Sequence, residues 1–129
     1  MTAAVFWRRA RFVGVAAVLL STVWGGLSDG IQNASGPGSA GQRVATATEL
    51  LYGVAAIAAL WALFAGKRWL GAALAPWIVG TTVTAGLAPV VWGGADWRAG
   101  TTSGIAAGVV TVIVAWGALA HQRSPSTST

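Results

Sequence analysis

The sequence predicts an all-α membrane protein: a four-helix transmembrane bundle, antiparallel and up-down-up-down, with both termini cytoplasmic. Three observations lead to this fold class. Hydrophobic residues make up 55% of the chain and charged residues only 9%, against about 25% charged residues in an average soluble domain. The hydrophobic residues gather into four long runs, and short polar or basic segments separate these runs. Because so few charges cannot cover a globular surface, we expect lipid around the chain.

Length and charge limit what else the chain can be. Its 129 residues leave room for one integral membrane domain, 1–129. The net charge is +5, but the basic residues lie between the apolar runs and do not form one stripe. Such residues set the orientation of a membrane protein, so we expect a lipid bilayer as partner and no nucleic acid. The absence of cysteine excludes disulfides, thiolate metal sites and cysteine nucleophiles.

The first apolar run covers residues 12–27 and follows three arginines. Arginines before an apolar run also describe a secretory signal peptide. The run continues through Trp24, however, and no Ala-x-Ala cleavage site follows it. We therefore predict a retained helix over residues 9–27. The next segment, residues 28–42, is rich in Gly, Ser, Asn and Pro, which predicts a flexible loop.

The second and third runs predict helices over residues 46–66 and 69–90. The very short basic turn between them predicts that these helices are neighbours. Pro76 lies well inside the third run and predicts a kink there, because its ring removes one backbone hydrogen bond. Pro89 lies near the end of the run, where we expect it to terminate the helix.

A polar turn over residues 93–98 precedes the fourth run, which predicts a helix over residues 99–120. About 20 apolar residues cross the hydrocarbon core of a bilayer, so this run is long enough to span it. The remaining residues, 121–129, form a Ser/Thr-rich tail that we expect to be disordered.

The orientation follows from the basic residues, since cytoplasmic loops carry the excess of Lys and Arg. Two basic residues, Arg43 and Arg98, fall on one predicted side of the membrane. Six fall on the other side, together with both termini: Arg8, Arg9, Arg11, Lys67, Arg68 and Arg123. The single lysine and the abundance of Ala, Gly and Arg are typical of a GC-rich bacterium, so we expect a multi-pass protein of the bacterial plasma (inner) membrane.

Small residues recur four apart along the apolar runs. Lipid tails are as apolar as Leu, so close approach of the backbones must hold such helices together. The fourth run carries a double Gly-x-x-x-Gly ridge, and the third carries a comparable row; the helix-packing residues are Gly100, Gly104, Gly108, Pro76, Gly80 and Thr84. These rows predict packing within one bundle. Self-association or docking on a larger membrane complex is the alternative.

The sequence offers no catalytic set. The apolar runs contain no His, Lys or Arg away from their flanks, and His121 stands without a second His or acid nearby. We therefore expect no enzymatic activity, no metal site and no cofactor.

Five charged residues are predicted on the outer side: Asp29, Glu49, Asp96, Arg43 and Arg98. We interpret them as solvated loop charges with local salt bridges, because exposed charges often do no more than this. The mouth of a cation or substrate site is the alternative.

Glu49 is the only acid within an apolar run, and two interpretations apply to it. Thr46 and Glu49 have the spacing of a capping box, in which Thr caps the helix and Glu follows three residues later. We favour this interpretation, which places Glu49 about 4–5 Å beyond the helix start at 1.5 Å per residue. In the alternative the helix begins earlier, and Glu49 lies deeper and pairs with Arg43, Arg98 or Tyr52.

These patterns favour a membrane protein without catalytic machinery, an accessory or scaffold component that packs through its glycine ridges. The first alternative is a small proton- or cation-coupled transporter that uses Glu49 with Tyr52 and the hydroxyls of Thr81, Thr82 and Thr84. In its four short helices and single membrane acid the chain resembles the small multidrug resistance exporters. Those exporters carry their essential Glu in the first helix, and residues 12–27 here contain no acid. A second alternative is a lipid or quinone site at the Pro76 kink, lined by Trp77.

Overall fold

The computed structural model describes residues 2–36 and 38–123. This part of the chain folds into four helices: α1 (Ala3–Ala34), α2 (Ala40–Ala65), α3 (Leu70–Val91) and α4 (Trp97–Arg123). All four are long and apolar enough to cross a membrane. The predicted all-α class and the predicted number of candidate spans are therefore confirmed.

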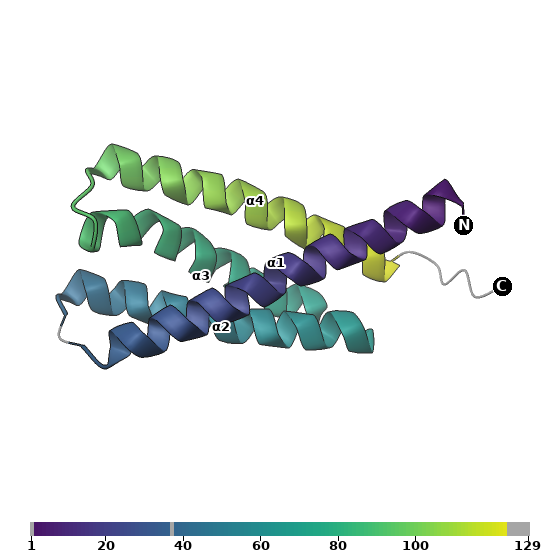
Figure 1. Cartoon of the computed structure of the whole chain (residues 1–129), viewed down its shortest axis with the longest axis horizontal. Helices are drawn as coiled ribbons and strands as arrows, with labels where there is room; N and C mark the ends of the chain where they lie inside the picture. The colour runs from purple at the N-terminus through teal and green to yellow at the C-terminus, as the bar shows by residue number, and fades with distance from the viewer. Residues whose placement is uncertain (1, 37, 124–129) are drawn as a thin grey trace.

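Each helix packs against the next one along the chain, and α1 also meets α4. Figure 1 shows that α1 crosses the other helices diagonally and meets α4 near one end of the molecule. The α1–α2 and α3–α4 connections lie at the opposite end. We name the end with these two connections the acidic end, because Asp29, Glu49 and Asp96 belong to it. The start of α1, the α2–α3 turn and the last turn of α4 belong to the basic end.

The first two helices are longer than the sequence predicts. Helix α1 begins at Ala3, where the Thr2 hydroxyl accepts a hydrogen bond from the backbone N–H of Val5. It also continues to Ala34, through the polar segment predicted as a loop. Ser28 and the residues after it can stay helical because an α-helix satisfies its backbone internally whatever its side chains are. The predicted bounds of residues 9–27 are therefore wrong at both ends.

Helix α2 begins six residues before the predicted start, because a different capping box is formed. Ser39 is the N-cap: its hydroxyl accepts from the Gln42 backbone N–H (3.2 Å), and the Gln42 side chain accepts from the Ser39 N–H (3.0 Å). This Ser-x-x-Gln pair satisfies two backbone donors reciprocally. The prediction that Thr46 caps the helix is wrong, and the hydroxyl of Thr46 instead donates to the Gln42 carbonyl inside the helix.

The remaining helix ends agree with the predictions to within three residues. Gly66 ends α2 in the left-handed conformation (φ 65°) that favours glycine. Pro89 lies in the last turn of α3, which ends two residues later, so proline does not itself end the helix. The residues up to Arg123, predicted as the start of a tail, extend α4. The rest of that predicted tail, residues 124–129, lies outside the described residues.

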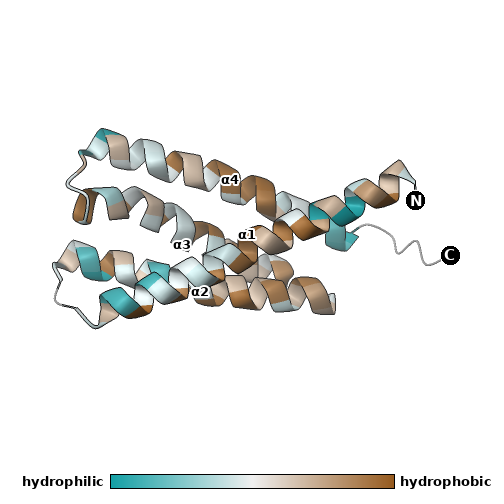
Figure 2. Ribbon diagram, in the orientation of Figure 1, coloured by the Kyte–Doolittle hydropathy of each residue, from teal (hydrophilic) through white to brown (hydrophobic). Residues whose placement is uncertain are grey.

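The core is built mainly from alanine, with a few large side chains. Trp77 is the largest fully buried one, and its indole N–H donates to the Thr22 hydroxyl on α1 (3.0 Å). Large apolar side chains face outward instead, and Trp24, Ile113 and Trp116 are each more than 60% exposed. Figure 2 shows brown along the middle of the helices, and teal at the left ends of α1, α2 and α4 and where α1 meets the last turn of α4. Such a surface suits lipid, as expected for a membrane protein.

Glycines bring the helices into backbone contact. A Cβ on Gly100 would lie 2.7 Å from the Gly86 carbonyl oxygen, and one on Gly104 would lie 3.3 Å from the Gly86 Cα. Gly108 faces the Thr82 side chain, so the glycine ridge of α4 lies against α3. Gly80 lies on another face of α3, where a Cβ would meet Tyr52 of α2 at 2.9 Å. The small residues thus hold neighbouring helices of the same chain together.

Candidate functional site

Glu49 is the tenth residue of α2 and lies far from the helix start. At 1.5 Å per residue it lies about 14 Å along the axis from Ala40, well beyond the 4–5 Å expected of a capping residue. The residue is 5% exposed. The interpretation of Glu49 as a helix cap is therefore wrong, and the earlier-start alternative describes its position.

The hydrogen bond that holds Glu49 comes from a neutral amide. Nδ2 of Asn33, in the last turn of α1, donates to Oε2 of Glu49 (3.1 Å). The two helices can come this close because α1 presents glycines to α2. A Cβ on Gly26 would lie 2.8 Å from the Glu49 carbonyl oxygen, and one on Gly30 would lie 2.6 Å from the Leu50 side chain. The extra turns of α1 therefore place Asn33 on the buried carboxylate.

The titratable neighbours of Glu49 are acidic. Asp29 is exposed one turn before Asn33 and repels the Glu49 charge electrostatically. Tyr52 follows Glu49 by three residues on α2, is half-buried, and packs against Gly26 of α1 and Gly80 of α3. Glu49, Tyr52 and Asp29 thus gather at the seam between α1 and α2.

The other predicted members of the site lie elsewhere. Asp96 caps α4, because its carboxylate accepts from the Ala99 backbone N–H (2.9 Å). Arg98 is exposed in the first turn of the same helix. Arg43 is exposed on α2, at the rim of a pocket beside Asn33. The structure therefore brings together Glu49 and Tyr52, but leaves Asp96 and Arg98 at the start of α4.

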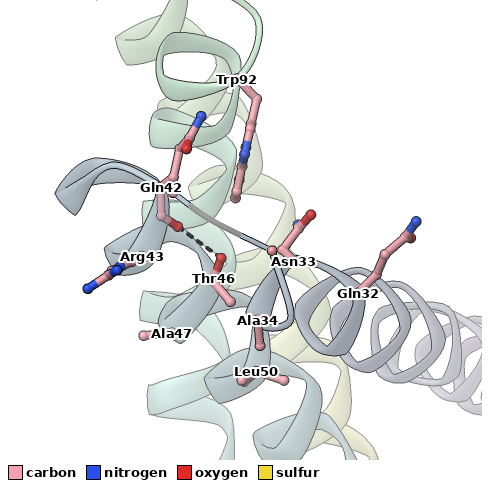
Figure 3. A pocket seen from close by; sticks show the side chains of 11 residues that line it. Gln32, Asn33, Ala34, Gln42, Arg43, Thr46, Ala47, Leu50 and Trp92 are labelled. Atoms are coloured by element: carbon pink, nitrogen blue, oxygen red, sulfur yellow. Dashed lines mark hydrogen bonds between the residues drawn. The ribbon is translucent and has the colours of Figure 1, made fainter.

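An open pocket of about 450 Å³ lies at the acidic end between the last turn of α1 and the start of α2. Figure 3 shows its mainly polar side chains, with Trp92 of the α3–α4 connection above them. Gln42 both caps α2 and donates from Nε2 to the Val91 carbonyl (3.0 Å), which ties α2 to the end of α3. The lining residues are Gln32, Asn33, Ala34, Gly36, Gly38, Gln42, Arg43, Thr46, Ala47, Leu50 and Trp92. Asn33 belongs both to this lining and to the Glu49 contact.

The threonines predicted to join Glu49 do not form one group with it. Thr84 makes a 2.6 Å hydrogen bond with Thr48 across the α2–α3 seam. Thr82 instead points toward α4, against Gly108. Within residues 2–36 and 38–123, the hydroxyls of Thr81 and Thr82 are buried without a hydrogen-bond partner. Thr84 and Thr82 therefore lie at two different helix–helix contacts, α2–α3 and α3–α4, and do not form a single site.

Sequence reasoning missed Asn33 and Gln42. Asn33 continues a row that includes Gly26 and Gly30, at the i, i+4, i+7 spacing of one helix face. Extending the first helix along that row would have predicted Asn33 at the α2 contact. Gln42 was detectable as the fourth residue of Ser39-Ala-Gly-Gln, which is a capping-box pattern.

Comparison of the chain with protein-family models, with curated proteins and with solved structures finds no match.

Proposed function

We propose that the protein is a small proton- or cation-coupled transporter of a bacterial plasma membrane, and that Glu49 is its ion-binding residue. Its four helices span the bilayer antiparallel, up-down-up-down, with both termini in the cytoplasm. The support for this orientation is the distribution of charge, since six of the eight Lys and Arg residues belong to the basic end.

One observation carries the function: a buried carboxylate whose hydrogen-bond donor is neutral. A carboxylate deprived of water is costly unless a proton or a cation compensates its charge. Asn33 supplies a donor but no charge, and Asp29 adds a second negative charge nearby. A proton or a small cation at Glu49 would relieve both costs. The polar pocket that shares Asn33 gives such an ion a hydrated approach from the acidic end.

Glu49→Gln is the direct test, because it keeps the size of the side chain and one oxygen that can accept from Asn33, and removes the charge. Purified protein reconstituted in liposomes on a solid support would be exposed to jumps of H⁺, Na⁺ or K⁺ concentration, and the transient current recorded. We expect the wild-type protein to give a current with at least one of these ions, and Glu49→Gln to abolish it.

Asp96→Asn is the matched control, since it removes one acidic charge from the same end of the molecule. Asp96 caps a helix and is exposed, so its variant should keep the ion-dependent current. Wild-type protein that elutes as a folded species yet gives no current with any of the three ions would refute the transport proposal. Equal currents in wild type and Glu49→Gln would refute the role of Glu49.

A second candidate function is an accessory or scaffold component. It is favoured by the close packing of α1 against α2 one turn after Glu49. A Cβ on Gly53 would lie 3.1 Å from the Leu27 backbone N, and Trp77 fills the core with no exposed surface. Transport would require this contact between α1 and α2 to open. The third candidate, a lipid or quinone site at Pro76, is not favoured, because the Trp77 ring that would line it is fully buried. Purification from native membrane separates the two candidates: a stoichiometric protein partner together with no ion-dependent current favours the scaffold.

A further inference from the structure

Three segments far apart in the sequence meet at the basic end. The Phe12 ring of α1 lies 4.7 Å, centroid to centroid, from the His121 ring of α4. Gly117 of α4 faces the Arg11 side chain, where a built Cβ would lie 3.8 Å from Cγ. The Gln122 amide donates to the Lys67 carbonyl, which joins α4 to the α2–α3 turn. Figure 2 shows the polar stretch of α1 crossing the polar last turn of α4 here.

This convergence gathers positive charge without acidic residues. The basic end carries six of the eight Lys and Arg residues, whereas the three acids of the chain belong to the opposite end. Salt screens exposed charges that lie more than about 8–10 Å apart, so the charges that act together are those of the meeting segments. The result is a one-sided positive field at this end of the molecule.

A small open pocket of about 380 Å³ lies on α1 within this end, and its lining is Ala4, Trp7, Arg8 and Arg11. Arg8 and Arg11 are three residues apart, so they occupy one face of the helix. Trp7 is 69% exposed beside them, and tryptophan side chains favour the headgroup level of a bilayer.

We propose that this pocket binds the headgroup of one anionic phospholipid. Guanidinium groups bind phosphate oxygens through paired, charge-assisted hydrogen bonds, and basic pockets at the membrane surface select anionic headgroups. Arg8 and Arg11 hold the phosphate, and Trp7 lies at the level of the glycerol backbone. Because the Arg11 side chain also faces Gly117 of α4, the bound lipid stabilises the crossing of α1 and α4. This site is separate from Glu49 and does not depend on its function.

Native mass spectrometry of the detergent-purified protein with added phosphatidylglycerol or phosphatidylcholine tests this site. We expect one tightly bound phosphatidylglycerol and no matching phosphatidylcholine. The double variant Arg8→Gln/Arg11→Gln should bind phosphatidylglycerol about 30-fold more weakly, given the typical contribution of two basic residues near a membrane surface. The control Arg43→Gln/Arg98→Gln removes the same charge from the acidic end, and its lipid affinity should stay within about twofold of wild type.

Three outcomes would overturn the proposal. Equal losses in both double variants would show a response to net charge alone, and equal binding of the two lipids would show no headgroup selection. Full competition by inorganic phosphate would indicate a site for free anions. If the Arg8/Arg11 variant does not fold, the salt dependence of the wild-type protein decides: preference for phosphatidylglycerol must fall as NaCl rises, and a salt-independent preference contradicts the site.

Discussion

A carboxylate that loses its contact with water needs another source of stabilisation. Glu49 keeps 5% of its surface exposed and receives a hydrogen bond from Asn33. Hydrogen bonds to charged groups stabilise a protein by about 1.5–3 kcal/mol, more than bonds between neutral groups. At the scale of single residues, Asn33 is therefore as important to the site as the acid itself, and it also joins α1 to α2.

Asn33→Ala tests that contribution. Removing the amide leaves the buried carboxylate without this donor, so we expect the free energy of unfolding to fall by about 1–3 kcal/mol. The measurement is reversible unfolding in mixed detergent micelles, followed by circular dichroism. Gln32→Ala is the control, because Gln32 is exposed and lines the same pocket; its effect should remain within about 0.5 kcal/mol. Equal effects of the two variants would contradict a specific role for Asn33.

The helices themselves show what their sequences could and could not predict. All four apolar runs were recognisable, because the bilayer requires about 20 apolar residues for each span, and Gly66 and Asp96 mark the ends of their helices by conformation and capping. The start of α2 was mispredicted because two capping boxes compete. Thr46–Glu49 and Ser39–Gln42 both fit the pattern, and the longer helix gains further backbone hydrogen bonds and buries Glu49 against α1.

The mispredicted start of α2 affects the candidate site more than it affects the fold. A helix that starts six residues earlier changes little in the architecture, but it moves Glu49 from the helix start to the tenth position. Its pairing with Asn33 depends on the length of α1 as well, and nothing in the composition of the polar segment specified that it would stay helical. Local patterns therefore predicted the four helices. The contact between Asn33 and Glu49 could not be predicted from them, because it depends on how the end of α1 packs against α2.

At the scale of the helix pair, Gly100 should be the least tolerant position of the α4 ridge. The Cβ of Gly100→Ala would lie 2.7 Å from the backbone oxygen of Gly86, so one helix must move. We expect the variant to lose about 1–3 kcal/mol of unfolding free energy, the usual cost of overpacking. Gly14→Ala is the control, because nothing lies within 4 Å of its built Cβ, and it should gain up to about 1 kcal/mol. Equal tolerance of both changes would show that α3 and α4 are not in backbone contact.

The whole molecule combines an apolar outer surface with a strongly asymmetric distribution of charge. The exposed faces of its helices carry large apolar side chains, and the acids and most of the basic residues belong to opposite ends. A bilayer accommodates both features, because lipid covers the middle and the cytoplasmic surface collects the positive charge. The glycine contacts of Gly80, Gly100 and Gly104 join consecutive helices of the same chain.

This asymmetry predicts which end of the molecule faces outward. The chain contains no cysteine, so a single introduced cysteine is an unambiguous reporter. Ser35→Cys, in the α1–α2 connection, and Ala65→Cys, at the end of α2, both replace exposed residues at opposite ends. In intact cells a membrane-impermeant maleimide should label Ser35→Cys, whereas Ala65→Cys should react only after permeabilisation, because the proposed orientation places the basic end in the cytoplasm. The reverse pattern would place both termini outside, and labelling of both cysteines in intact cells would contradict a single orientation.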